Sequence, residues 1–203
     1  MTGSNGNGKP DNGYLFQDPD HGPINVTLDH FERRLAKNLA KERQNWCVRM
    51  NVMDQKKAAK LSGVLITEEG TAAEIAFAKV FNLCPDFSVC QFSKFDFVLV
   101  SGLRVDAKQS GNKRGNLIVK AATKRNGTDL FALVLGSDQT NFSIWGYAWA
   151  GDLLRPENLD MTLPVPGYRM RRADLLDPRD LFNPDPSALK ARRLALKAIG
   201  VLN

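Results

Sequence analysis

The chain has 203 residues, of which 43% are hydrophobic and 25% are charged, and it carries a formal net charge of +6. This length allows one hydrophobic core of ordinary size and is too short for two full catalytic domains. No apolar run approaches the ~18 residues needed to cross a bilayer, so the composition excludes a membrane-spanning protein and predicts a soluble one with no membrane partner.

Residues 1–27 are predicted to be a disordered or extended lead-in. Residues 1–13 are rich in glycine and asparagine and lack the apolar segment of a signal peptide. The three cysteines, Cys47, Cys84 and Cys90, form no Cys-x-x-Cys pair. An odd number of isolated thiols fits a reducing cytoplasm better than a disulfide framework, so we expect a cytoplasmic protein without an iron–sulfur or zinc-ribbon site.

Residues 28–62 are predicted to be a basic amphipathic helical arm. Apolar residues recur there at spacings of three and four, at Leu28, Phe31, Leu35 and Leu39. The arm holds nine basic and four acidic residues, a balance that favours a polyanionic partner such as DNA. No heptad repeat is sustained, so the pattern allows a homodimer through this helix without requiring one.

Residues 63–154 are predicted to be the folded core. A helix is expected over Thr71–Phe81, because its small residues and its two phenylalanines suit close packing on a sheet. β-rich runs separated by turn residues follow at Phe87–Phe92, Phe95–Val100, Leu103–Gln109, Leu117–Lys120, Asp129–Leu135 and Phe142–Tyr147. One helix followed by these strands predicts an α/β fold with a central mixed sheet flanked by helices.

Residues 155–203 are predicted to be an extended, proline-rich tail. Prolines at this density are incompatible with a central sheet strand or a long helix. A last helix is expected over Ser187–Ile199, with Ser187 as its N-cap and four basic residues along it.

The chemistry is expected around a short acidic and basic motif in the core. Asp106 and Lys108 lie two residues apart on a predicted strand, so both side chains project from one face, and the Ala107 carbonyl between them is available as a ligand. Asp96 interrupts an otherwise apolar strand, where an unpaired buried carboxylate costs free energy. Carboxylate and carbonyl oxygens are the ligands that hold the divalent cation needed for phosphodiester hydrolysis.

Taken in order, the helix of residues 70–79 with Glu74, then Asp96, then residues 106–109, resemble the PD-(D/E)xK, or restriction-endonuclease-like, nuclease superfamily. The resemblance covers residues 63–154. It implies a restriction-endonuclease-like core and a Mg²⁺- or Mn²⁺-dependent phosphodiesterase that cleaves DNA. Small nucleases of this type occur in phages and mobile elements, which implies by analogy a role in DNA processing in a bacterial or phage-infected cell.

The resemblance also implies a role for each residue of the motif. Asp96, Asp106 and the Ala107 carbonyl would bind the metal, Glu74 would assist them, and Lys108 would position or activate the attacking water. Gln109 stands where many members carry a polar residue, so its amide would contact phosphate or water.

The first aspartate of the motif has two candidates. Asp96 lacks a preceding proline, whereas a literal Pro-Asp occurs at Pro85–Asp86. A two-residue turn at Ser101–Gly102 would place Asp96 and Asp106 on opposite faces of the hairpin. A three-residue connection, residues 100–102 with Gly102 in the left-handed conformation, pairs Asp96 directly with Asp106. We predict this bulged hairpin.

Several residues also have a purely structural interpretation. Glu74 follows Thr71 by three residues and would suit a capping box. Five basic residues after the motif are candidate phosphate contacts or simply solvated: Lys113, Arg114, Lys120, Lys124 and Arg125. The alternating Trp145, Tyr147 and Trp149 suit the core or an interface better than base stacking. Only two histidines occur, His21 and His30, which argues against histidine-based hydrolysis.

Two alternative functions remain open at this point. In the first alternative, the chain would be a nuclease-fold protein that binds nucleic acid, or inhibits its processing, without cleaving it. The basic arms would then be the functional part. In the second alternative, the chain would be a structural or interaction protein. The acids would form salt bridges with Lys79, Lys94 or Arg104, and the motif would be coincidental. Metal binding distinguishes the first alternative from an active nuclease.

Overall fold

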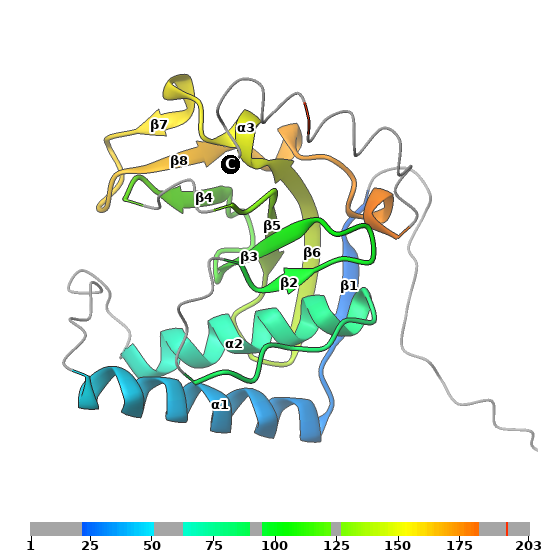
Figure 1. The fold of residues 1–203 in the computed structure, drawn as a ribbon, viewed down its shortest axis with the longest axis vertical. Helices are drawn as coiled ribbons and strands as arrows, with labels where there is room; N and C mark the ends of the chain where they lie inside the picture. Colours follow the sequence, from blue (N-terminus) through cyan, green and yellow to red (C-terminus); the bar gives the residue numbers. More distant parts are fainter. Residues whose placement is uncertain (1–21, 51–62, 90–94, 123–126, 183–193, 195–203) are drawn as a thin grey trace, which may run out of the picture.

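The computed structural model describes residues 22–50, 63–89, 95–122, 127–182 and 194. A curled five-stranded sheet lies at its centre, in the order β1-β6-β5-β3-β2 (Figure 1). Its strands are β1 (Ile24–Thr27), β2 (Phe97–Val98), β3 (Arg104–Ser110), β5 (Leu130–Leu135) and β6 (Asn141–Trp149). β3 and β5 are parallel and the other neighbours are antiparallel, which makes the sheet mixed.

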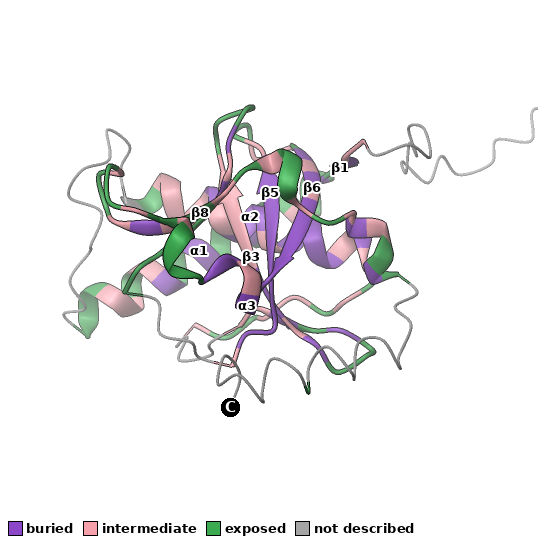
Figure 2. Cartoon of the chain, turned by 90° about the horizontal axis from the view of Figure 1, so that it is seen from above, coloured by how far each residue is buried: buried purple, intermediate pink, exposed green. Residues whose placement is uncertain are grey.

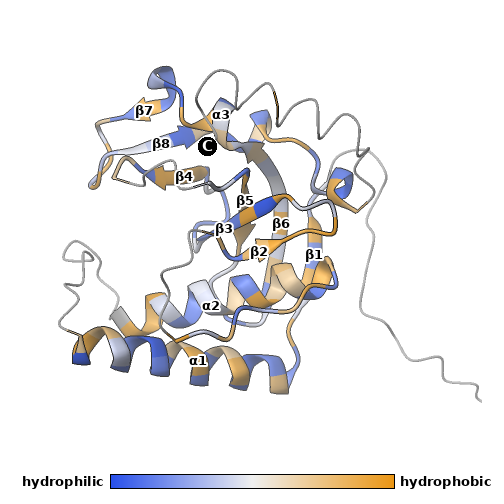
Figure 3. Cartoon of the chain, viewed as in Figure 1, coloured by the Kyte–Doolittle hydropathy of each residue, from blue (hydrophilic) through white to orange (hydrophobic). Residues whose placement is uncertain are grey.

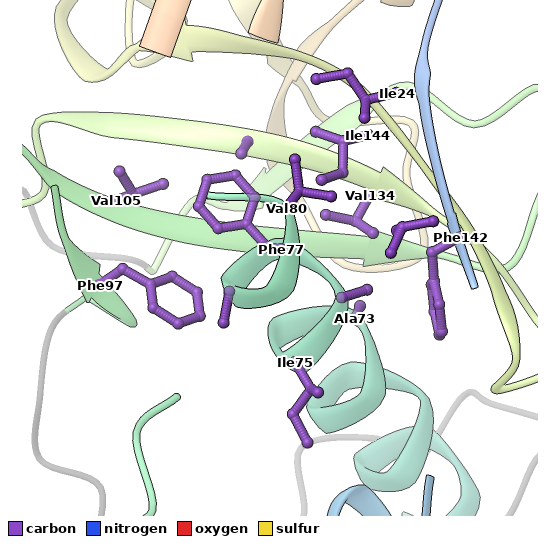
Figure 4. Close-up of a cluster of buried hydrophobic side chains, with 14 of the residues drawn as sticks. Ile24, Ala73, Ile75, Phe77, Val80, Phe97, Val105, Val134, Phe142 and Ile144 are labelled. Carbon is purple, nitrogen blue, oxygen red and sulfur yellow. The ribbon is translucent and has the colours of Figure 1, made fainter. Parts of the chain in front are cut away.

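Two long helices, α1 (His30–Arg49) and α2 (Gly63–Val80), lie on one face of this sheet. α1 begins at a capping box, in which the Asp29 carboxylate accepts from the Glu32 backbone N–H and the Glu32 carboxylate accepts from the Asp29 backbone N–H. α2 packs directly on the strands, with Phe77 fully buried and stacked on Phe97 at 5.3 Å between ring centroids (Figure 4). This contact ties the helix to the short edge strand β2.

The second face of the central sheet is covered mainly by a small antiparallel sheet. Its strands are β4 (Leu117–Lys120), β8 (Gly167–Met170) and β7 (Leu159–Asp160). The one-turn helices α3 (Ala150–Leu153), η1 (Pro156–Asn158) and η2 (Arg172–Asp174) accompany it, whereas η3 (Pro178–Leu181) buries Leu181 in the core cluster on the α2 side. The connection between the parallel strands β3 and β5 contains β4 and no long helix. Both long helices therefore lie on the other face of the central sheet.

Both faces of the central strands are therefore covered. All six residues of β5 are buried, as expected for a strand packed on both sides. Figure 2 shows β5 and most of β6 in the buried colour. The α/β class with a central mixed sheet is confirmed. Within the described residues, no helix is long and apolar enough to cross a membrane.

The structure corrects several predicted elements. The helix predicted over Thr71–Phe81 begins much earlier, at Gly63. The strand predicted over Phe95–Val100 shortens to Phe97–Val98. Residues 87–89 of the strand predicted over Phe87–Phe92 are not in a strand, and the rest of that run lies outside the described residues. Local β-propensity fails there because no strand of the sheet lies beside these residues to pair with them.

The apolar face of α1 also differs from the prediction. Phe31 is 76% exposed and Leu35 is exposed as well, whereas the buried positions are Ala36, Leu39, Ala40 and Arg43. Small alanines let α1 approach α2 closely, so the helix turns this face inward. Its exposed residues include apolar and basic ones, and Figure 3 shows hydrophobic and hydrophilic segments alternating along the helix.

The two ends of the described chain contain strands that were not predicted. Residues 24–27, expected in the lead-in, form the edge strand β1 through antiparallel pairing with β6. Residues 159–160 and 167–170, expected in an extended tail, form two strands of the small sheet. The helix predicted over Ser187–Ile199 lies outside the described residues except for Leu194.

We predict that Phe77→Ala lowers the free energy of unfolding by about 3–5 kcal/mol, because it leaves a cavity between α2 and the sheet. Urea unfolding followed by circular dichroism measures the change. Phe31→Ala is the matched control, an exposed phenylalanine on the neighbouring helix, and should change stability by less than ~0.5 kcal/mol. Equal effects of the two substitutions would contradict this account of the core.

Candidate active site

The β2–β3 hairpin has the predicted three-residue connection. Phe97 pairs with Val105, and the Leu99 N–H donates to the Leu103 carbonyl at 2.8 Å. Gly102 has φ of +78°, the left-handed conformation that this turn requires. The paired register ends at Phe97 and Val105, so the structure confirms the three-residue connection but contains no strand pair between Asp96 and Asp106.

Asp96 lies just before β2, where β2 stops pairing with β3. Its backbone N–H donates to the Val105 carbonyl at 2.8 Å, and its Oδ2 accepts from the Ala107 N–H at 2.7 Å. The Asp96 carboxylate thus accepts the β3 N–H that a backbone carbonyl of β2 would accept if the strand continued. Since backbone groups alternate along a strand, the Ala107 carbonyl faces the same side as its N–H, toward Asp96 and away from β5.

Asp106 and Lys108 project together from the face of β3 that is turned away from α2. The Lys108 Nζ lies 2.6 Å from the Asp106 Oδ1. The Asp106 side chain is 12% exposed and that of Lys108 is 34% exposed, so the ammonium remains open to solvent while the carboxylate is largely buried. Figure 3 shows a hydrophilic segment in β3 at the centre of the fold.

Gln109 points the other way, toward α2. Its Nε2 donates to the Gly136 carbonyl at 2.6 Å and lies 3.5 Å from the Glu69 Oε2. The structure therefore does not bring Gln109 together with Asp106 and Lys108, although the three are adjacent in sequence. Strand alternation explains this separation, because odd and even positions of β3 face opposite sides. Its amide binds the backbone at the end of β5, whereas we expected it to contact phosphate or water.

Glu74 lies in the middle of α2 and is held by a buried arginine from α1. The Arg43 Nη1 lies 2.8 Å from the Glu74 Oε2, and Arg43 is only 7% exposed. The same guanidinium donates to the carbonyls of Asp86 and Ser88. Because α2 begins at Gly63, Glu74 is not part of an N-terminal capping box.

The acids of the site influence one another. Burial, followed by the charges of Glu74 and Asp106, raises the pKa of Asp96 well above its usual range. Burial also raises the pKa of Glu74, although the Arg43 charge opposes this, and the Asp106 and Asp86 charges add to the rise. Asp86 therefore belongs to the same electrostatic cluster, but its carboxylate accepts from the Ser88 N–H, whereas Asp96 contacts the motif strand directly.

These oxygen donors suit a hard divalent cation in chemical type. In the described residues, however, no group of three or more His, Cys, Asp or Glu side chains is arranged to hold a metal ion. Two of the three acids are engaged by cationic side chains, Glu74 by Arg43 and Asp106 by Lys108. Metal binding would require Asp106 to exchange the Lys108 ammonium for the ion.

The remaining predicted residues lie around this centre. Lys113, Arg114 and Lys120 are exposed, and Lys124 and Arg125 lie outside the described residues. Of the cations proposed to neutralise the acids, Lys79 contacts Glu32 at 2.8 Å and Arg104 contacts the buried Asp129 at 3.1 Å, while Lys94 lies outside the described residues. Tyr147 and Trp149 are buried in the core, as expected.

Arg43 was not predicted as a site residue. Its signal in the sequence is its place on α1, four residues after Leu39 and seven after Ala36, which makes it a charged residue on a buried helix face. A buried arginine requires an acidic partner, and Glu74 is that partner.

Comparison with protein-family models, with curated proteins and with solved structures finds no match to this chain. The function is therefore inferred from the site alone.

We predict that Asp96→Asn raises the melting temperature at pH 7–8 by a few degrees in metal-free buffer. A carboxyl group whose pKa is raised in the folded state stabilises the fold fully below its unfolded pKa, and this stability is lost as the pH rises through the folded pKa. Asparagine keeps the acceptor for the Ala107 N–H without the charge. Thermal unfolding between pH 4 and pH 8 in EDTA should therefore show a difference that shrinks toward pH 4.

Asp160→Asn is the control with the opposite sign. Hydrogen bonds from Thr162, followed by the charge of Arg169, lower the pKa of Asp160, so its contribution is present at neutral pH and is lost as the pH falls. This variant should be less stable than the wild type at pH 7 and equal to it at low pH. Parallel pH profiles for the Asp96 and Asp160 variants would refute the electrostatic account of the site.

We also predict that Arg43→Met lowers the free energy of unfolding by about 3–5 kcal/mol, because it leaves Glu74 buried without its guanidinium. Adding Glu74→Gln should recover part of this loss, since the uncompensated charge is then removed. Urea unfolding of the wild type, both single variants and the double variant measures the coupling. Arg49→Met, at the exposed end of the same helix, serves as the control. Strictly additive effects of Arg43→Met and Glu74→Gln on the free energy of unfolding would contradict an energetic coupling between Arg43 and Glu74.

Proposed function

We propose that the protein is a Mg²⁺- or Mn²⁺-dependent nuclease of the PD-(D/E)xK type that hydrolyses phosphodiester bonds in DNA. The observation that carries the proposal is the geometry of β3, where Asp106 and Lys108 contact each other on one face and Asp96 binds the backbone of Ala107 between them. An acid-bearing helix ahead of an antiparallel hairpin, within a mixed sheet, is also the arrangement that a restriction-endonuclease-like core implies.

Asp96, Asp106 and the Ala107 carbonyl would hold the divalent cation, with Glu74 assisting. A cation held there would polarise the scissile phosphate and lower the pKa of a bound water. The raised pKa of Asp96 supports this role, because clustered acids that repel one another gain most from a cation.

Lys108 would act on the substrate directly. Its side chain is about one-third exposed next to Asp106, so its ammonium can donate hydrogen bonds to the attacking water or to a phosphate oxygen. Asp106 holds this ammonium in place before substrate arrives. Arg43 is a positioning residue in this scheme, because it fixes Glu74 and the 86–88 segment without reaching the reacting groups.

The outer face of α1 would attract the DNA backbone. It exposes basic residues along its whole length, at Arg33, Arg34, Lys37, Lys41 and Arg49. Contacts of this kind supply affinity that falls with salt and does not depend on sequence. They suit an enzyme that recognises the phosphate chain first.

The second candidate is a nucleic-acid-binding or inhibitory protein that does not cleave. It is favoured by the two ion pairs, Arg43 with Glu74 and Lys108 with Asp106, which neutralise two of the three acids without a metal. The basic helix would then be the functional part, and the cluster of acids would be a remnant with a structural role.

We predict that the wild type cleaves DNA with Mg²⁺ or Mn²⁺, and that Asp106→Asn and Lys108→Met each lower the cleavage rate by about 10²–10⁴-fold. Linear, circular and branched DNA are the substrates, and cleavage of circles identifies an endonuclease. Asp160→Asn, far away in the small sheet, is the control and should cleave like the wild type. Binding without any cleavage by the wild type, with either metal, would replace the nuclease by the second candidate.

A further inference from the structure

A β-bulge in β6 displaces Trp145 from the regular ladder. Leu133 pairs with Gly146 and Val134 pairs with Ile144, so Trp145 is the extra residue between them. Bulges of this kind redirect a side chain and are common beside functional sites. Trp145 is half-buried, whereas Tyr147 and Trp149 farther along the strand are buried in the core.

The indole of Trp145 is held by an arginine. The Arg172 guanidinium carbon lies 3.7 Å from the centroid of the Trp145 ring. Arg172 in turn donates from Nη1 to the Lys113 carbonyl at 3.0 Å and from its backbone N–H to the Asn116 side chain. These contacts fix the orientation of the ring before any ligand arrives.

Trp145 separates two hollows on the surface. One, of about 540 Å³, is lined by Trp145, Lys113, Asn25, Asn141, Ser143 and Asp138, among others. The other, of about 700 Å³, is lined by Trp145 and Arg172. We call the first hollow the indole groove. Its walls combine an aromatic ring and a lysine, which are groups that bind a nucleobase and its phosphate. The amides of Asn25 and Asn141 are hydrogen-bonded within the protein, to Ser143 and to Thr27 and Asp138, respectively.

The indole groove lies on the same face of the central sheet as Asp106 and Lys108. Ser110 pairs with Leu135, Leu135 with Ser143, and Ser143 with Asn25, which makes one continuous row across the sheet. Ile24 and Val26 pack in the core on the α2 side, so Asn25 between them faces the groove. The row crosses from β3 to β6 in two strand spacings, about 10 Å, and it starts at Ser110, two residues or about 7 Å beyond Lys108 along β3.

We propose that the indole groove binds an unpaired base of single-stranded DNA next to the cleavage centre. This inference rests on the proposed nuclease function and specifies its substrate. The base stacks on the indole, and the exposed Lys113 contacts the adjoining phosphate. A base in a duplex has both faces stacked on its neighbours, so it enters the groove only when it is unpaired.

The test compares binding of single-stranded and duplex DNA in EDTA, where no metal-dependent cleavage occurs. Fluorescence anisotropy with labelled oligothymidylate and with a labelled hairpin duplex gives the two dissociation constants. Trp145→Ala should weaken the binding of single-stranded DNA by about 5- to 150-fold, which is the contribution of one stacked base. It should change the binding of duplex DNA by less than about twofold. Trp145→Phe should keep most of the affinity, because a phenyl ring also stacks.

A second measurement does not depend on the alanine variant. Oligothymidylate should quench part of the tryptophan fluorescence of the wild type, and Trp145→Phe should abolish this change. The proposed base-binding role of the groove would be wrong if the wild type and Trp145→Ala bound single-stranded DNA with equal affinity. It would also be wrong if Trp145→Ala lost the same factor of affinity for single-stranded and duplex DNA. If the wild type then still cleaves DNA, the nuclease stands without this subsite. If the wild type binds neither DNA form and cleaves neither, both proposals fail.

Discussion

The arrangement of the site depends on one hydrogen bond, between the Asp96 carboxylate and the Ala107 N–H. β2 is only two residues long, so it stops pairing where the motif of β3 begins. Asp96 continues the ladder with a side chain in place of a backbone carbonyl. A sheet edge that elsewhere exposes backbone groups is thereby turned into a place where a carboxylate, a carbonyl and the Asp106–Lys108 pair meet.

The surrounding structure keeps these charges close together at a cost in stability. Glu74 and Asp96 are both buried enough that their pKa values rise, and only Glu74 has a guanidinium beside it. The fold tolerates this because the α2 face of the sheet is densely packed, with Phe77, Ala76 and Val105 fully buried. Clusters of acids with shifted pKa values are typical of functional sites.

The features set by local sequence were predictable. The hairpin followed from the alternation of β2 and β3 and from a glycine at Gly102, and the Asp106–Lys108 contact followed from their spacing. Features set by distant partners were not. β1 pairs with a strand more than a hundred residues away, and Arg43 has its partner on another helix. Neither partner is visible from the composition of the segment itself, and Gln109 shows that adjacency in sequence does not guarantee a shared face.

The pairing of β1 with β6 also bears on how the protein folds. The side chains of Asn25 and Ser143 contact each other across 118 residues of chain, so this contact closes a very long loop. Long-range closure is slow relative to helix formation, and α1 and α2 precede β6 in the chain, so we expect these helices to form first. We therefore expect the basic helix to form during synthesis before the acidic centre is assembled, so the exposed cations of α1 would be present on the nascent chain before the acids are brought together.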